Sequence, residues 1–198
     1  LNFRIARQIN DCGNKAIVHI LNENTVWNTL IISPPGFGKT TLLKDIIKKI
    51  SNGIPEFNFK GVTCGVVDER GELSATYKGI SQNDLGIRTD VIDNIPKALG
   101  MKMLIRSMSP KVIIADEIGK KEDVDAIEYA VTSGVKGIFT AHGSDLEQIE
   151  HNPILNQWII NGYIEKVLAM DKQRNVHLLY EKQSKRKQNI LLLVVIGI

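Results

Sequence analysis

Cysteines, aromatic residues and an excess of one charge are all scarce in this chain of 198 residues. The two cysteines, Cys12 and Cys64, have no metal-binding spacing around them, which excludes a disulfide-stapled scaffold or zinc site and favours a reducing, cytosolic compartment. Lys and Arg total 25 against 22 Asp and Glu, so the net charge of +3 lacks the strongly basic balance of a dedicated nucleic-acid binder. Aromatic residues make up only 6%, which leaves few side chains for stacking on bases. We therefore expect no nucleic-acid partner.

Long hydrophobic runs are also missing. No stretch reaches the ~20 apolar residues of a membrane-spanning helix, and the amino end lacks a charged flank followed by an apolar core. We therefore expect a soluble chain with no direct membrane span. With 43% hydrophobic and 24% charged residues, the composition is that of one globular domain that buries a core without disulfides or metal. Because the chain begins at Leu1 rather than a methionine, we also expect that an upstream domain is missing.

Short apolar runs alternate with segments of helical spacing. The runs predict buried strands at 29–32, 62–67, 111–115, 137–140 and 166–170. Apolar residues from Leu42 to Ile50 form one helical stripe that stops at Gly53, and a second stripe from Val124 to Val131 predicts another helix. This alternation predicts a three-layer α/β fold with a mostly parallel sheet covered on both faces. Residues 176–180 are expected to return as an antiparallel edge hairpin.

A glycine-rich segment lies between the first predicted strand and the first predicted helix. It consists of Ser33, Pro34, Pro35, Gly36, Phe37, Gly38, Lys39, Thr40 and Thr41. This context predicts a loop whose backbone N–H groups surround the phosphates of ATP, with Lys39 on the β- and γ-phosphates and the Thr40 hydroxyl on Mg²⁺. Serine replaces the usual first glycine, so Ser33 fits only if its backbone avoids the φ values that favour glycine.

The predicted strand from Val112 ends in two carboxylates, Asp116 and Glu117. Because successive strand residues point to opposite sides, we expect Asp116 to face Mg²⁺ and Glu117 to orient the attacking water as general base. We expect this strand to be a neighbour of the strand that precedes the loop. The alternative is that both acids cap the following helix or form a surface ion pair.

Two other strand ends carry polar residues to the same edge of the sheet, where ligands of parallel α/β sheets bind. The strand at 62–67 is followed by an acidic cluster, in which Glu69 or Glu72 supports the metal or the water; the alternative is a solvated loop. The strand at 137–140 leads to His142, a candidate sensor of the γ-phosphate. Its alternative is an ordinary satisfied polar side chain.

Taken together, these motifs resemble the stage III sporulation protein AA family. The resemblance covers residues 2–179 and is carried by segments 31–41, 68–72, 86–91, 104–110, 116–119 and 140–143. That family is related to the ring ATPases of type II and type IV secretion systems, which carry a Walker A loop, an acidic box, a Walker B strand and a histidine box in this order. The resemblance implies a P-loop ATPase fold of the RecA or AAA type, ATP and Mg²⁺ as ligands, and an endospore-forming bacterium.

The same resemblance implies an assembly. It indicates a cytosolic ATPase of the mother cell, arranged as a hexameric ring, that docks on membrane-embedded sporulation channel proteins between mother cell and forespore. In a ring, an arginine of one subunit can complete the ATP site of its neighbour. Arg88 and Arg106 are the candidates and Arg70 is a third, with an ordinary ion pair inside the domain as the alternative for each.

The sequence divides into three segments: a lead-in at 1–28, a P-loop ATPase domain at 29–181 and a basic, then apolar tail at 182–198. As a helix the apolar residues 190–198 would span about 14 Å, under half of a ~30 Å bilayer core, so they cannot cross a membrane alone. We expect a non-native or poorly packed end; an added strand and a peripheral anchor are the alternatives.

Three other functions remain open from the sequence. A nucleotide kinase would use the same loop, although no lid with clustered arginines follows Asp116. A DNA-translocating ATPase would need basic and aromatic surface. A docking scaffold would bind ATP without hydrolysing it.

Overall fold

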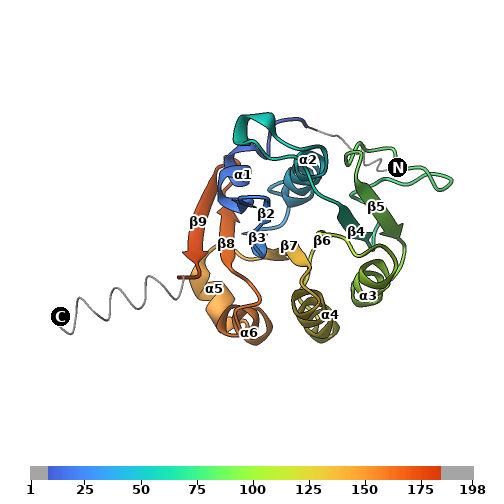
Figure 1. Cartoon of the computed structure of the whole chain (residues 1–198). Coiled ribbons are helices and arrows are strands. Elements are labelled where there is room, and N and C mark those ends of the chain that lie inside the picture. The colour runs from blue at the N-terminus through green and yellow to red at the C-terminus, as the bar shows by residue number, and fades with distance from the viewer. Residues whose placement is uncertain (1–8, 184–198) are drawn as a thin grey trace, which may run out of the picture.

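The computed structural model describes residues 9–183 and centres on a single sheet. Within these residues seven strands lie in the order β5-β4-β6-β7-β3-β8-β9. All neighbouring pairs are parallel except β8 and β9. This confirms the mostly parallel sheet and the antiparallel hairpin at its carboxyl-terminal edge (Figure 1). The strands are β3 (Thr29–Ser33), β4 (Cys64–Asp68), β5 (Thr89–Asp93), β6 (Val112–Ala115), β7 (Lys136–His142), β8 (Lys166–Met170) and β9 (Val176–Glu181).

Helices cover both faces of the sheet, which completes the expected three layers. One face carries α1 (Asn14–Ile20) and α2 (Lys39–Asn52). The other carries α3 (Lys97–Met108), α4 (Lys121–Thr132), α5 (Leu146–His151) and α6 (Pro153–Ile160). The short strands β1 (Leu21–Asn22) and β2 (Thr25–Val26) form a separate hairpin, and the 3-10 helix η1 (Pro55–Phe57) follows α2.

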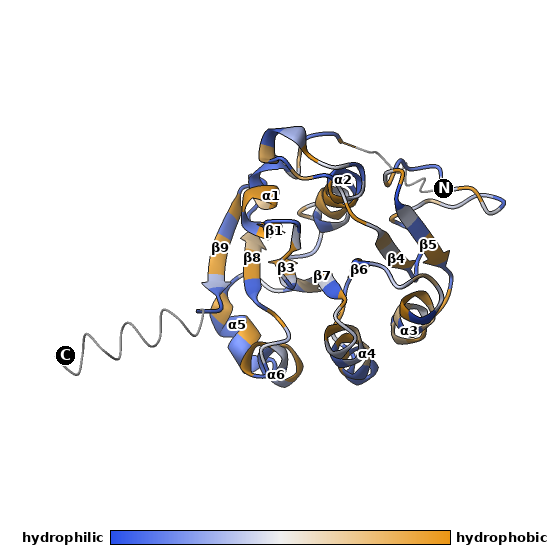
Figure 2. Ribbon diagram, viewed as in Figure 1, coloured by the Kyte–Doolittle hydropathy of each residue, from blue (hydrophilic) through white to orange (hydrophobic). Residues whose placement is uncertain are grey.

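The core consists of one apolar cluster on each side of the sheet. All five residues of β3 are buried, which is the pattern of a parallel strand covered on both faces. Because side chains alternate along a strand, Ile31 packs with α2 while Leu30 and Ile32 pack with the opposite helices. Hydrophobic residues accordingly follow the strands and the inward faces of the helices (Figure 2).

The helix expected from the stripe at Leu42 is α2. Its apolar positions are buried against the sheet, and the helix ends at Gly53, where φ is 98°. A positive φ of this size suits glycine, which has no Cβ to clash with the neighbouring carbonyl. The second expected stripe is α4, which begins at Lys121 and is followed by Gly134 with φ of 75°.

One expectation about the sheet is wrong: the strand that leads to Asp116 is not next to the strand that leads to the phosphate loop. Strand β7 lies between β6 and β3 and pairs with both. The order of strands depends on where each crossover helix returns the chain to the sheet. Hydrophobic patterning predicts which segments are strands but not their order. Strand β7 is also longer than the expected 137–140, so His142 belongs to it as well.

Residues before β3 pack on the same core as the strands. Ile17 and Ile20 of α1 and Val26 of β2 are buried in the cluster that contains α2. The boundaries of the three predicted segments stay a prediction, and the apolar end at 190–198 lies outside the described residues. Among the helices of residues 9–183, none is both long enough and apolar enough to cross a bilayer.

Candidate functional site

The loop between β3 and α2 has the backbone that a phosphate site requires. Gly36 and Gly38 have φ of 80° and 104°, in the region that residues with a Cβ rarely adopt. Ser33 ends β3 and does not have a positive φ, so the exchange of glycine for serine brings no strain there. Gly38 then caps α2, which begins at Lys39.

The first turn of α2 points its free N–H groups toward this loop. The first helical bond runs from the N–H of Leu42 to the carbonyl of Gly38 (2.9 Å), so the amides of Lys39, Thr40 and Thr41 precede the helical ladder. Such amides and the positive end of the helix dipole attract anions. The loop and the helix therefore form a phosphate-binding geometry.

Lys39 is buried beneath the loop. Its ammonium donates hydrogen bonds to the carbonyls of Ser33 (2.8 Å) and Pro34 (3.4 Å). Burial lowers the pKa of Lys39, and the carboxylates of Asp116 and Glu117 act in the opposite direction. Because this partly desolvated cation also lines the open pocket beside the loop, it would be stabilised by an anion bound there.

Asp116 faces the first turn of α2. Thr40 Oγ1 donates to Asp116 Oδ2 at 2.8 Å, and Thr140 Oγ1 on β7 donates to the other carboxylate oxygen. The hydroxyl and carboxylate oxygens here are the ligand types that Mg²⁺ prefers, so the donor set of Thr40 and Asp116 fits this ion. Thr140 was missed in the sequence, although its position two residues before His142 on one strand indicates that both point to the same side.

Glu117 takes a different direction from Asp116. Its φ is 53°, and its carboxylate forms an ion pair with Arg70 and lies 3.5 Å from His142 Nε2. Its N–H donates to Thr140 Oγ1 at 2.8 Å. The two acids therefore point in different directions, but both follow the end of β6 at Ala115, so the turn at Glu117 and not strand alternation separates them.

His142 lies between Lys39 and Glu117. Lys39 Nζ is 3.2 Å from His142 Nδ1, and the other ring nitrogen faces Glu117. An ammonium has donors only, so Nδ1 must accept and Nε2 carries the proton that points toward the carboxylate. His142 thus connects the phosphate-loop lysine to the second acid.

These groups surround one open pocket of about 560 Å³, a size suited to a small-molecule ligand. Its lining residues come from the loop, the start of α2, the segment after β4 and the ends of β6 and β7: Pro35, Gly36, Gly38, Lys39, Thr40, Thr41, Arg70, Glu72, Glu117 and His142. The structure thus brings together most of the predicted site residues and adds Arg70 from the same chain.

Glu69 does not line this pocket. Its carboxylate bonds to Lys97 at 2.5 Å and lies 3.8 Å from Lys120, on the side of α3 and α4. The hydrogen bond from Lys97 lowers the pKa of Glu69. Of the two acids named for this cluster, Glu72 is the one that reaches the pocket beside Lys39.

Buried Asp68 fixes the segment that carries Arg70 and Glu72. Its carboxylate accepts hydrogen bonds from the backbone N–H groups of Glu72 (2.9 Å), Leu73 (3.1 Å) and Ser74 (2.8 Å) and from the Ser74 hydroxyl (2.6 Å). Asp68 therefore has a positioning role that the sequence did not indicate.

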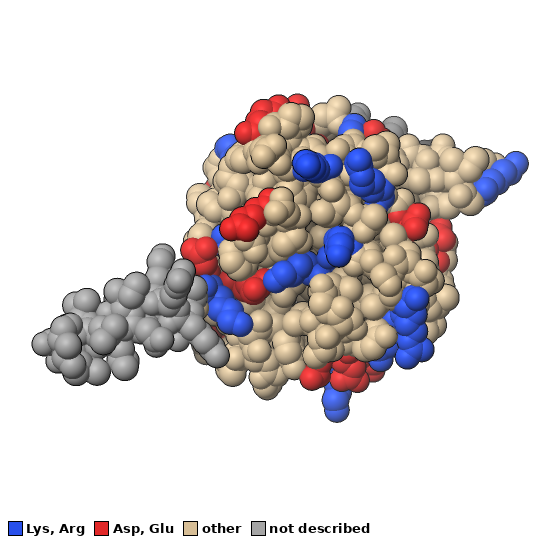
Figure 3. Space-filling view, viewed as in Figure 1, with Lys and Arg blue, Asp and Glu red and all other residues tan. Residues whose placement is uncertain are grey.

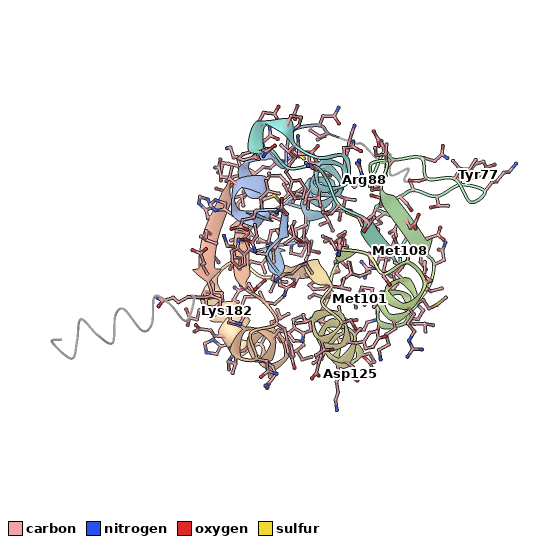
Figure 4. All side chains as sticks on the ribbon, in the orientation of Figure 1. Tyr77, Arg88, Met101, Met108, Asp125 and Lys182 are labelled. Carbon is pink, nitrogen blue, oxygen red and sulfur yellow. The ribbon has the colours of Figure 1, made fainter. Side chains whose placement is uncertain are left out.

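Arg88 and Arg106 lie away from the pocket of their own chain. Arg88 donates to the carbonyls of Ser51 (2.9 Å) and Asn52 (3.4 Å), at the end of α2 opposite Lys39. Figure 4 labels Arg88 on the side of the sheet that carries α2. At 1.5 Å per residue the two ends of α2 are about 20 Å apart. Arg106 lies over the ring of Tyr129, 5.8 Å from its centroid, and so joins α3 to α4.

Comparison with known proteins gives a consistent result. A family described as "Sporulation stage III, protein AA" matches residues 1–187. The chain is 40% identical over 184 residues to Stage III sporulation protein AA of Bacillus subtilis (strain 168), covering 91% of this chain and 59% of that protein.

Two solved structures share the fold. The ATPase DotB of Legionella pneumophila superposes with a TM-score of 0.58 at 19% identity, covering 90% of this chain and 51% of that one. The pilus retraction motor PilT with bound ADP gives 0.56 at 15% identity, covering 86% and 53%. The chain thus spans between half and three fifths of the length of these proteins. The fold is that of the P-loop secretion ATPases, and the chain belongs to the Sporulation stage III, protein AA family.

Proposed function

We propose that this chain binds ATP with Mg²⁺ and hydrolyses it to ADP and phosphate. The observation that carries the proposal is the set of three contacts beside one pocket: Thr40 with Asp116 at 2.8 Å, and His142 with both Lys39 and Glu117. Binding of ADP by PilT and the ATPase activity named for DotB, two proteins of the same fold, support it.

The phosphate loop supplies binding. The amides at the start of α2 and the freed backbone of Gly36 and Gly38 hold phosphate oxygens, and Lys39 neutralises the β- and γ-phosphates. Thr40 and Asp116 hold Mg²⁺, which supplies charge neutralisation when bound.

Glu117 orients the attacking water and accepts its proton. The ring of His142 contacts both Lys39 and this carboxylate, so a change in Lys39 on phosphate binding is passed to Glu117 through a single side chain. Arg70 holds Glu117 from the other side. Because positioning and charge supply most of phosphoryl-transfer catalysis, this short chain of contacts supports a role for Glu117 in placing the water.

The finer function that we propose is that of a ring ATPase in the mother cell, working on membrane-embedded sporulation channel proteins. The family and the secretion-ATPase fold support this proposal. On the face drawn in Figure 3, Lys and Arg are interspersed with Asp and Glu, which agrees with a protein partner better than with a nucleic acid.

A hexameric ring would give Arg88 and Arg106 a role in trans. Arg88 lies at the end of α2 opposite the loop, so it can reach a nucleotide only on a neighbouring subunit. If it does, inactive Arg88→Ala and Lys39→Ala subunits regain partial turnover when mixed, and mixed rings without recovery remove the role. The unfolding transition of Arg88→Ala, compared with that of the parent chain, shows whether the variant subunit remains folded.

Phosphate release from ATP without an added acceptor tests the proposed activity. We expect release by the parent chain, loss of release with retained ATP binding in Glu117→Gln, and loss of both in Lys39→Ala. An equal background rate in all three proteins would support the docking scaffold instead. A requirement for a nucleoside monophosphate would favour the kinase, and stimulation by single-stranded DNA would favour the translocating ATPase.

A further inference from the structure

A short hairpin projects from the molecule between β4 and β5. Tyr77 and Ile80 exchange both of their backbone hydrogen bonds, at 2.9 and 3.0 Å. The two turn residues between them, Lys78 and Gly79, have φ of 51° and 78°, and positive φ at both positions gives the tight turn that matches the twist of paired strands. We call residues 75–82 the arm, and Figure 4 labels Tyr77 on it, well away from the sheet.

The base of the arm is fixed by hydrogen bonds. The carbonyl of Ser74 accepts from the N–H groups of Gln82 and Asn83, both at 3.0 Å. The buried side chain of Asn83 donates to the carbonyl of Leu73 at 2.6 Å. The Ser74 hydroxyl donates to the buried carboxylate of Asp68, also at 2.6 Å. The arm is therefore held in a defined position relative to β4.

The tip of the arm presents apolar side chains to water. Tyr77 is 64% exposed and Ile80 is 67% exposed. Because these residues are directly paired, their side chains lie on one face of the hairpin, and Lys78 Nζ lies 5.4 Å from the centroid of the Tyr77 ring. Neighbouring exposed apolar side chains on a fixed projection are typical of an interaction surface, and tyrosine is enriched at the centre of such surfaces.

The charge of the arm indicates what kind of surface would receive it. Residues 73–83 include one lysine and no acidic residue, so a complementary surface is apolar and acidic. Helices α5 and α6 offer this combination, because residues 144–163 include three acidic residues and neither Lys nor Arg. Glu147 and Glu150 of α5 are exposed, and Ile160 at the end of α6 is 71% exposed.

The arm and the two helices lie at opposite ends of the chain. Strand β5 forms one edge of the sheet and β9 forms the other. The arm extends beyond β5, whereas α5 and α6 lie toward β8 and β9 (Figure 1). The two surfaces can therefore meet only between copies of the chain. Contact between two different surfaces of identical chains repeats from copy to copy and forms a ring where the rotation closes.

We propose that the tip of the arm docks on α5 and α6 of a second copy of this chain. Its apolar side chains lie against Ile160, and Lys78 faces Glu147 and Glu150. The proposal rests on the proposed ring for its repeating arrangement and deepens it by naming the two surfaces that meet. The contact involves no nucleotide, so association can be measured separately from ATP hydrolysis.

Reversal of charge on each surface tests this pairing. Sedimentation velocity over a concentration series, at low salt and with ATP·Mg²⁺ present, measures association. Lys78→Glu should weaken association about tenfold, because like charges then oppose each other across the contact. The double variant Glu147→Lys/Glu150→Lys should weaken it in the same way. Lys60→Glu is the matched control, since Lys60 is exposed and belongs to neither surface.

An equimolar mixture of the two charge-reversed proteins gives the sharpest result. When they alternate, every contact again joins opposite charges, so we expect the mixture to associate as the parent does. Parent-like association of each variant alone, a mixture without recovery, or an equal loss in Lys60→Glu would overturn the proposal.

Tyr77→Ser/Ile80→Ser tests the apolar part of the contact. We expect weaker association with an unchanged unfolding midpoint, because both side chains are exposed in the single chain. Parent-like association in this variant would overturn the docking of the arm and leave the proposed ring standing. A parent that stays monomeric at every concentration would overturn both. A monomeric parent that binds vesicles of anionic lipid through Tyr77 and Ile80 would assign the tip to a membrane surface instead.

Discussion

The hydroxyl of Thr40 bonds to the carboxylate of Asp116 at 2.8 Å, across 76 positions of sequence. The first turn of α2 and the end of β6 are thereby joined, although β7 separates their strands in the sheet. Thr140 of β7 closes the gap, since its hydroxyl bonds to Asp116 and accepts from the N–H of Glu117. The oxygens that we propose as Mg²⁺ ligands are therefore oriented before any ligand arrives, which lowers the cost of ordering them on binding.

Thr140→Val should remove the hydrogen bonds of the Thr140 hydroxyl to Asp116 and Glu117 with little change in side-chain shape. We expect the free energy of unfolding to fall by about 1–3 kcal/mol, because a buried acceptor and donor lose their partner. Mg²⁺-dependent ATP affinity should also weaken, about tenfold. Urea unfolding and ATP titrations check the two effects, with the exposed Thr132→Val as control. Wild-type affinity in Thr140→Val would mean that Asp116 needs no support from β7.

Lys39→Met should raise the stability of the nucleotide-free protein while it abolishes nucleotide binding. The ammonium is buried, and burial outweighs the favourable effect of Asp116 and Glu117, so part of its desolvation cost is not offset until a phosphate binds. Thermal unfolding without and with ATP·Mg²⁺ measures both effects. We expect a higher midpoint than the parent without nucleotide and no further increase when nucleotide is added. A lower midpoint without nucleotide would contradict the cost assigned to this lysine.

The affinity for ADP should depend on pH through the same residue. Burial lowers the pKa of Lys39, so the ammonium that binds phosphate is present below this lowered value and is lost as the pH rises through it. ADP binding should therefore weaken on the alkaline side before an ordinary lysine would titrate. The unfolded chain holds this proton more tightly, so the Lys39 contribution to unfolding free energy rises with pH over the same window. ADP titrations of the parent and of Lys39→Arg across pH 8–10.5 provide the comparison, because arginine keeps its charge over this range. If the ADP affinity of both proteins fell in the same way with pH, Lys39 would not be the source of the dependence.

Asp68→Ala should loosen the segment that carries Arg70 and Glu72. Two backbone amides and a hydroxyl in the buried part of this turn lose their acceptor, so we expect about 2–4 kcal/mol less unfolding free energy. The control is Asp90→Ala, which removes an exposed carboxylate from β5. Chemical denaturation measures both; equal, small losses would show that the turn holds itself without Asp68.

Much of the nucleotide site could be predicted because its elements carry strong local patterns. The run before Ser33 and the stripe after Lys39 are a buried strand and an amphipathic helix by composition alone, and both are found as β3 and α2. The different directions of Asp116 and Glu117 were expected from strand alternation, but β6 ends at Ala115 and the chain turns at Glu117, where φ is 53°, so the turn sets the direction of Glu117.

The remainder depended on contacts between distant segments. Strand β5 is a half-exposed edge without an apolar run, and α3 has Gly100 within its length, so neither stands out in the sequence. The position of β7 between β6 and β3 is set by how the crossover helices connect the strands, which local sequence patterns do not predict. Arg70 was considered as a residue reaching a neighbouring subunit, whereas its guanidinium contacts Glu117 of the same chain.

A crystal structure of Glu117→Gln grown with ATP and Mg²⁺ tests the central claim most directly. The account requires the phosphates on the first turn of α2, the γ-phosphate within hydrogen-bonding distance of Lys39, and the metal ion between Thr40 and Asp116. A nucleotide bound anywhere else on the molecule, or phosphates on the loop with Glu117 and His142 turned away from them, would contradict it.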